Sequence, residues 1–197
     1  MAARKAQFSR EEIIDAAFEM VRENGWKGLS VPALAKAINC STMPVYSHFK
    51  NVRELEDVVY LKALDFLTEF MMVQRSGDVW LDHAINYTRF AAEERQLFHC
   101  LFDGRNPELQ MVSLRKWAQL LAEQLSDYPL FEGLSEEQIH TIRYSRFMLI
   151  HGIASGINNG WHMQKNKTPD ELENFLRKAS KALFDGLKAQ FEAEDLE

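Results

Sequence analysis

The chain has 197 residues, 23 Lys and Arg against 29 Asp and Glu side chains, a formal net charge of −6 and 46% hydrophobic residues. This composition excludes disordered, collagen-like and disulfide-stapled proteins, because the chain can build an apolar core and has two cysteines. No apolar run approaches membrane-spanning length, and none follows the basic residues Arg4 and Lys5 as in a secretory signal. We therefore expect no membrane association and a location in the cytoplasm.

The charge is unevenly distributed along the chain. Residues 1–53 carry eight basic and five acidic side chains, a net charge of +3, whereas residues 54–197 carry 15 basic and 24 acidic ones, a net charge of −9. The overall acidity argues against a nucleic-acid partner, because neutralising phosphates requires a basic surface. The uneven distribution, however, predicts a small basic head over residues 1–53 and a larger acidic body over residues 54–197.

Apolar residues recur at helical spacing throughout, and no segment alternates with the period of a β-strand. Helix-capping pairs precede four of the apolar runs: Ser9 and Glu12, Asn51 and Glu54, Ser135 and Gln138, and Thr168 and Glu171. The sequence therefore predicts an all-α fold of about nine helices, with a three-helix head joined by a fourth helix to a larger helical body. The expected helices cover residues 9–24, 31–38, 42–49, 51–73, 79–98, 107–126, 135–158 and 169–193, with a short helical turn near 97–103.

The two short helices of the head predict a helix-turn-helix with its turn at Asn39 and Cys40. In the second of them, Val45 and Phe49 are expected to point inward at a spacing of four residues. The opposite face then exposes Met43, Tyr46, Ser47 and Lys50. Such a face suits contact with a DNA duplex, although ordinary packing is the alternative for Tyr46 and for His48. The expected contacts are with phosphates for Tyr46 and Lys50, and with base edges for Thr42, Met43 and Pro44.

These residues resemble the DNA-binding domain of the TetR family of transcriptional regulators, over about residues 9–67. The signature of the family's recognition helix is matched by Ser41, Val45, Tyr46, His48 and Phe49. The resemblance implies that Ser30 caps the helix-turn-helix at the phosphate backbone and that His48 joins Tyr46 and Lys50 on phosphates. Two positions depart from the family pattern: Asn39 stands where Gly is frequent, and Val52 where Lys is usual, which weakens the expected phosphate contact.

A single head of this size reads few base pairs, so we expect a homodimer on a palindromic operator of double-stranded DNA. Gly152, Gly156 and Gly160 recur every four residues near the end of a long predicted helix, although glycine destabilises a helix interior. Close approach of a partner helix is one explanation, and fraying of the helix end is the other. The resemblance further implies a repressor, its common form, although the sign of regulation stays open.

The resemblance also implies a pocket for a small-molecule effector in the body, where aromatic side chains at helical spacing are otherwise typical of a core. The candidate ligand-binding residues are Trp80, Tyr87, Phe90, His99, Phe102, Trp117, Phe147, His151 and Trp161, with Cys100 and Asn158 as further polar candidates.

Catalytic, metal and cofactor motifs are not found in the sequence, so we expect neither an enzyme nor a bound metal or cofactor. The densest cluster of metal-ligating types is His99, Cys100 and Asp103, but neighbouring helical residues point about 100° apart and do not chelate one ion together. A redox role for Cys40 or Cys100 is left open. The competing functions are a helical protein-interaction module and a small-molecule enzyme.

Overall fold

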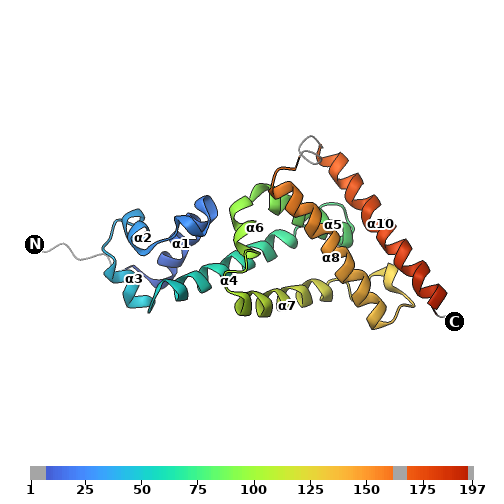
Figure 1. Cartoon of the computed structure of the whole chain (residues 1–197), viewed down its shortest axis with the longest axis horizontal. Coiled ribbons are helices and arrows are strands. Elements are labelled where there is room, and N and C mark those ends of the chain that lie inside the picture. Colours follow the sequence, from blue (N-terminus) through green and yellow to red (C-terminus); the bar gives the residue numbers. More distant parts are fainter. Residues whose placement is uncertain (1–7, 162–167, 195–197) are drawn as a thin grey trace, which may run out of the picture. The chain divides into compact units, whose positions relative to one another are not determined.

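The computed structural model describes residues 8–161 and 168–194, so Arg4 and Lys5 of the predicted basic head lie outside it. The described residues form nine α-helices, two short 3-10 helices and no strand, which confirms the all-α prediction (Figure 1). None of these helices combines the length and the apolar character needed to cross a membrane. The α-helices are α1 (Arg10–Asn24), α2 (Val31–Ala37), α3 (Met43–His48), α4 (Val52–Met71), α5 (Val79–Glu93), α6 (Arg95–Leu101), α7 (Pro107–Glu123), α8 (Glu136–Asn158) and α10 (Pro169–Glu194).

The predicted capping residues set the starts of most long helices. Ser9 and Ser135 each form both hydrogen bonds of a capping box. Thr168 does the same at α10, where its backbone and side chain pair with Glu171. At α4 the predicted box is only half correct. Asn51 accepts a hydrogen bond from the backbone of Glu54, but the Glu54 carboxylate accepts one from the backbone of Lys50 rather than from that of Asn51.

The prediction of a single helix over residues 79–98 is wrong, because the structure separates α5 from α6 at Glu94, whose backbone leaves the helical region (φ −111°, ψ 52°). The Glu94 carboxylate accepts hydrogen bonds from the Nε and Nη2 atoms of Arg22, at 2.8 and 2.6 Å. On α6, the carbonyl of Cys100 accepts a hydrogen bond from the indole of Trp26. These contacts join residues more than 70 positions apart, so helical periodicity could not reveal the break.

The chain packs as two compact units. The first unit comprises Met1–Thr68 and Glu94–Lys116, and the second comprises Glu69–Glu93 and Trp117–Glu197. The boundaries therefore fall inside α4, between α5 and α6, and inside α7. This is a division by packing, and the functional boundary after residue 53 stays a prediction.

In the first unit, α1 packs against α2, α3 and α6. Gly25 ends α1 with a positive φ of 65°, and a Cβ atom there would lie 2.8 Å from the Gln96 side chain on α6. The positive φ favours glycine here, and a larger residue would also have to displace the end of the flexible, exposed Gln96 side chain. The fully buried large side chains that fill the helical head include Ile13, Val21, Leu34, Val45, Phe49 and Leu55.

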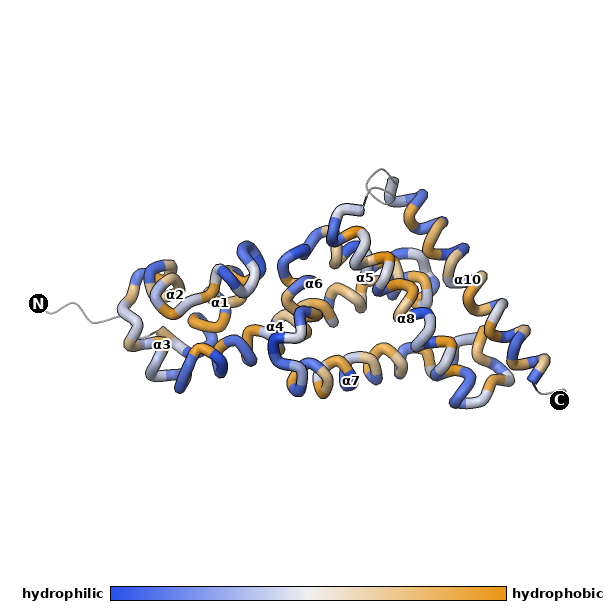
Figure 2. Tube along the Cα trace, in the orientation of Figure 1, coloured by the Kyte–Doolittle hydropathy of each residue, from blue (hydrophilic) through white to orange (hydrophobic). Residues whose placement is uncertain are grey.

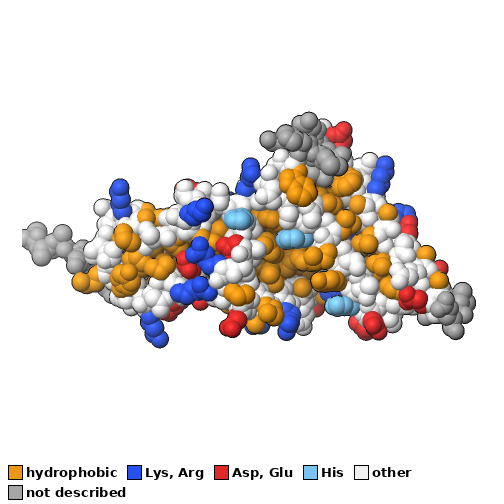
Figure 3. All heavy atoms as spheres, in the orientation of Figure 1, with side chains coloured by type: hydrophobic (Ala, Val, Ile, Leu, Met, Phe, Trp, Pro, Cys, Tyr) orange, Lys and Arg blue, Asp and Glu red, His pale blue; other side chains and the backbone are white. Residues whose placement is uncertain are grey.

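In the second unit, α5 packs against α8, and α10 packs against both. Figure 2 shows hydrophobic and hydrophilic residues alternating along α10, as expected for a helix with one buried face. Arg146 of α8 is buried among these helices: its guanidinium lies 3.9 Å from the centre of the Trp80 ring and donates hydrogen bonds to the Trp80 carbonyl and the Ser180 hydroxyl. Burial lowers the pKa of Arg146 to about 9. Figure 3 shows hydrophobic side chains gathered on the part of this unit that includes α8.

Candidate functional site

The helix-turn-helix consists of α2, a tight turn and α3. Ser30 caps α2 by accepting a hydrogen bond from the backbone of Ala33 at 3.3 Å, which confirms its capping position. Asn39 has a φ of 53° and is the one non-glycine residue of the described chain with a positive φ, as the predicted left-handed turn requires. The turn is closed by a backbone hydrogen bond from Cys40 to Ala35.

One face of α3 is locked into the head and the other is exposed, as predicted. Val45 and Phe49 are each 1% exposed, and the guanidinium of Arg10 lies 5.0 Å from the centre of the Phe49 ring. Met43 is 69% exposed and Tyr46 is 54% exposed. The remaining candidates for DNA contact are Thr42, Ser47 and Lys50, which are exposed, and Pro44, which is half-buried.

Two of the candidate DNA-binding residues are hydrogen-bonded within the head. The Nε2 atom of His48 lies 3.0 Å from the carbonyl oxygen of Phe8, and the Ser47 hydroxyl donates to the carbonyl of Pro44 at 2.7 Å. His48 thereby ties the segment before α1 to the end of α3, a contact that the sequence does not signal. The phosphate contact expected of His48 stays a prediction.

The basic residues that follow α3 differ in their partners. Lys50 is exposed, and its ammonium forms no ion pair with the described residues. Arg53, by contrast, lies 3.5 Å from the carboxylate of Asp57 and donates a hydrogen bond to the carbonyl of Arg105. The Arg53 guanidinium is therefore engaged within the protein, whereas the Lys50 ammonium has no such ion pair.

Four of the candidate ligand-binding residues form one aromatic cluster in the second unit. Tyr87 of α5 lies with its ring centre about 6.0 Å from those of Trp117, Phe147 and His151. The Tyr87 hydroxyl is 2.8 Å from the Nδ1 atom of His151. Burial raises the pKa of Tyr87 well above its usual value and lowers the pKa of His151. The Nε1 atom of Trp117 is buried without a hydrogen-bond partner in the described structure, an unusual state for a polar group.

The other candidates lie elsewhere. Trp80 packs in a separate core beneath Arg146, and Phe90 is fully buried with its ring edge-on to Phe70 at 5.5 Å. His99 is exposed and Phe102 half-buried in the first unit. Trp161 is 64% exposed and covers Gly156, where a Cβ atom would lie 3.1 Å from the indole ring.

The remaining polar candidates have structural partners. The Asn158 side chain donates a hydrogen bond to the carbonyl of Ala91 at 3.0 Å. Cys100 is buried, and burial raises the pKa of its thiol to about 11, which keeps it protonated and unreactive at neutral pH. Within residues 8–161 and 168–194, no three His, Cys, Asp or Glu side chains come together as a metal site would require.

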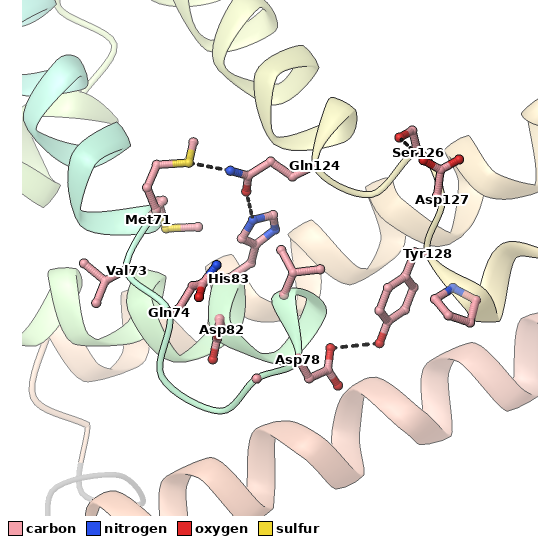
Figure 4. Close-up of a pocket in the computed structure, with 14 residues that line it drawn as sticks. Met71, Val73, Gln74, Asp78, Asp82, His83, Gln124, Ser126, Asp127 and Tyr128 are labelled. Carbon is pink, nitrogen blue, oxygen red and sulfur yellow. Dashed lines mark hydrogen bonds between the residues drawn. The ribbon is translucent and has the colours of Figure 1, made fainter.

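A separate cavity of about 550 Å³ lies in the second unit and was not predicted (Figure 4). It is formed by the end of α4, the connection to α5, the first turns of α5 and residues 124–129. None of the candidate ligand-binding residues lines it. The available sequence signal is the polar break at Ser76, Gly77 and Asp78, which falls between the helices expected over residues 51–73 and 79–98.

Known proteins share both this head and this fold. The sequence model described as "Bacterial regulatory proteins, tetR family" matches residues 13–56. An uncharacterized HTH-type transcriptional regulator of Mycobacterium tuberculosis is 30% identical over 162 residues, which cover 77% of this chain and 71% of the relative.

Two solved structures share the fold at lower identity. A tetR-family transcriptional regulator from Streptomyces coelicolor has a TM-score of 0.72 at 20% identity, over 92% of this chain and 82% of the other. The transcriptional regulator FadR of Bacillus subtilis, solved in complex with stearoyl-CoA, has a TM-score of 0.56 at 19% identity, over 91% of this chain and 97% of the other. With its helix-turn-helix and its regulator relatives, the chain belongs to the TetR family: it is a transcriptional regulator with a DNA-binding helix-turn-helix, not an enzyme.

Proposed function

We propose that the protein is a ligand-responsive homodimeric repressor that acts in the cytoplasm on a palindromic operator. The observation that carries the proposal is the exposed face of α3, where Met43 and Tyr46 are more than half exposed while Val45 and Phe49 are buried. Met43 and Tyr46 lie three residues apart and therefore share one face of α3, beside the exposed Ser47. A helix presented in this way matches the geometry of a recognition helix in the major groove.

Each candidate residue has a role that its position supports. Thr42, Met43 and Pro44 lie at the start of α3 and would face base edges, since recognition helices read bases with their N-terminal residues. Tyr46 and Lys50 would contact phosphates, which position the protein without reading sequence. The residues assigned to the DNA interface are Ser30, Thr42, Met43, Pro44, Tyr46, Ser47, His48 and Lys50.

The exposed face of α8 supports the homodimer. Tyr144 is 60% exposed, Met148 is 48% exposed, and Gly152 follows at the same four-residue spacing, where a Cβ atom would meet nothing within 4 Å. Gly186 of α10 is likewise open, and Phe175 is 37% exposed. A two-fold interface between α8 and α10 of two protomers would cover this apolar surface. Gly156 has a different role, because it accommodates Trp161 of its own chain.

The aromatic cluster around Tyr87 supports a site for a small-molecule effector, and its unpartnered Trp117 indole offers a donor for a ligand. The Bacillus subtilis regulator of the same fold holds stearoyl-CoA. The expected lever is α4, which follows the helix-turn-helix and whose Phe70 contacts Phe90 of α5. A ligand releases DNA only to the extent that it prefers the conformation that does not bind DNA.

The test is a selection of random DNA duplexes by the full-length protein at low salt. We expect a palindrome with half-sites about one helical turn apart. Lys50→Ala should then weaken binding to the recovered duplex and lower the salt slope by about 1. Lys116→Ala, which removes an exposed lysine of α7 outside the proposed dimer interface, is the matched control and should leave both unchanged. Failure to enrich any duplex would favour a protein-interaction module.

A further inference from the structure

The cavity in the second unit has an apolar part and a strongly acidic part (Figure 4). Met71, which is 3% exposed, contributes to its apolar wall together with Val79 and Tyr128. Its volume of about 550 Å³ lies within the range of about 300–1,000 Å³ that is typical of small-molecule sites. The space is therefore large enough for an organic ligand with an apolar body.

The acidic part consists of Asp78, Asp82 and Asp127, and no Lys or Arg side chain lines the cavity. The Asp82 carboxylate accepts hydrogen bonds from the backbone of Arg75 and from Ser76. Burial alone would raise the pKa of Asp82, but the hydrogen bonds together lower it by more than burial raises it. The net shift is downward, so Asp82 stays ionised at neutral pH. Asp78 accepts a hydrogen bond from the Tyr128 hydroxyl at 2.9 Å.

None of the three carboxylates forms an ion pair within the described residues. The buried Arg146 interacts with Asp78 only beyond ion-pair distance. Asp78 also caps α5 by accepting hydrogen bonds from the backbone of Trp80 and Leu81. With three carboxylates and no Lys or Arg side chain in its lining, the wall of the cavity is negatively charged, and such a wall attracts a cation.

His83 adds a hydrogen-bond acceptor to this cavity. It is 6% exposed, and burial lowers the pKa of its imidazole, so the ring is neutral at pH 7. Its Nε2 atom lies 2.7 Å from the Oε1 atom of Gln124, whose amide nitrogen is directed to the sulfur of Met72. Gln124 therefore accepts the Nε2 proton, which leaves the lone pair of Nδ1 without a partner in the described part of the chain. An acceptor of this kind at the wall of a cavity is satisfied by a ligand that donates an N–H group.

We propose that this cavity binds an organic ammonium ion whose N–H groups face His83 and the carboxylates and whose apolar body lies on Met71, Val79 and Tyr128. The charge of the wall selects a cation, the free Nδ1 atom selects one that carries N–H, and the apolar wall selects one with a hydrocarbon or aromatic body. This site is distinct from the aromatic cluster around Tyr87, and it does not depend on DNA binding.

Three probes of similar shape separate these contributions: 1-naphthylmethylammonium, its N,N,N-trimethyl analogue, and 1-naphthylacetate. Binding to the full-length protein is measured by isothermal titration calorimetry at pH 7. We expect the ammonium ion to bind more tightly than the trimethylammonium ion, and the anion not to bind. Equal affinity for the ammonium ion and the anion, or no binding of either cation, would overturn the proposal.

Two variants place the binding in this cavity. Asp127 is exposed and caps no helix, so the Asp127→Asn variant should fold normally. Its affinity for both cations should fall by about fivefold, because it lacks the attraction of one solvated charge at close range. Glu137→Gln, an equal charge change on an exposed residue of α8 outside the cavity, should leave their affinity unchanged. Equal effects of the two substitutions would show that net charge alone is responsible, and would overturn the proposed site.

The role of His83 is tested by His83→Phe, which removes the acceptor and keeps a ring. The readout is the ratio of the two cation affinities, because a general loosening of the cavity would weaken both probes alike. We expect the preference for the ammonium ion over the trimethylammonium ion to fall to about 1. A preference that survives the substitution would overturn the assignment of Nδ1 as the acceptor.

Discussion

The two packing units differ in the size of the cavities that their described residues line. In the first unit, loop residues that precede α7 are tied to α4: Arg105 pairs with Glu56 at 2.9 Å and Asn106 with Asp57 at 2.7 Å. The cavity beside the unpartnered Tyr60 hydroxyl measures about 10 Å³, room for a single water at most. The second unit holds a cavity of about 550 Å³.

This difference matches two kinds of recognition. A helix that reads DNA acts through an outer surface, so the unit behind it can be closely packed. A unit that binds small molecules needs internal space and polar groups left unpaired until a ligand arrives, at some cost in stability. The following substitutions test whether the first unit is the more closely packed of the two.

The largest effect is expected for Phe49→Ala in the first unit. Removing a 1% exposed ring should lower the free energy of unfolding by about 3–5 kcal/mol, measured by urea denaturation followed by circular dichroism. Met43→Ala on the exposed face of α3 is the control and should change it by less than about 0.5 kcal/mol while weakening DNA binding. Similar destabilisation by both substitutions would contradict the two-faced packing of α3.

Gly25→Ala should destabilise the first unit by about 1–3 kcal/mol, because the new Cβ meets the Gln96 side chain and the backbone has a positive φ. Gly77→Ala in the second unit introduces the same backbone conflict at a φ of 80° but has nothing within 4 Å. Its cost should be about 1 kcal/mol. The difference between the two thermal unfolding shifts therefore measures the cost of displacing the Gln96 side chain, and equal shifts would contradict such a cost.

Tyr87→Phe removes the hydroxyl that pairs with His151 and should cost about 1 kcal/mol of unfolding free energy. Thermal unfolding provides the measurement. Tyr144→Phe removes an exposed hydroxyl from the same unit and should leave the stability of the monomer unchanged. If Tyr87→Phe leaves the free energy of unfolding unchanged, the aromatic cluster is loosely ordered without ligand.

The smallest effect is a dependence on pH. Burial lowers the pKa of both His83 and His151 from 6.5, so below that pH the unfolded chain binds more protons than the folded one. Stability of the second unit should therefore fall as the pH decreases from 7 to 5. A variant with both histidines replaced by Phe should lose part of this dependence, whereas His140→Gln, at an exposed position, should retain it. Unfolding midpoints at the two pH values decide the outcome.

Local signals in the sequence were sufficient for most of the fold and for the face of α3. Ser9, Ser30 and Ser135 act through residues three positions away, and the alternation of Val45 and Phe49 with exposed neighbours follows from helix geometry. Contacts between distant segments could not be predicted in this way.

The break at Glu94 depends on Arg22, and the unpartnered acceptor of His83 depends on Gln124. Tyr87, Trp117 and Phe147 were named as ligand candidates on the resemblance to the family, and their helical spacing could not separate them from Trp80, which lies in another core. The cavity was missed because it is formed largely by connections between helices, whose path no periodic pattern describes.

The first unit is built from two stretches of chain with part of the second unit encoded between them. The indole of Trp26 donates a hydrogen bond to the carbonyl of Cys100, which lies 74 residues later in the chain. Arg22 donates to the carboxylate of Glu94, which lies 72 residues later. During synthesis, the DNA-reading helices therefore leave the ribosome before the residues that support them. At about 5–20 residues per second, the interval lasts several seconds. A fragment that ends at the predicted boundary after residue 53 would contain the recognition helix but would lack Glu94 and Cys100, the hydrogen-bond partners of Arg22 and Trp26.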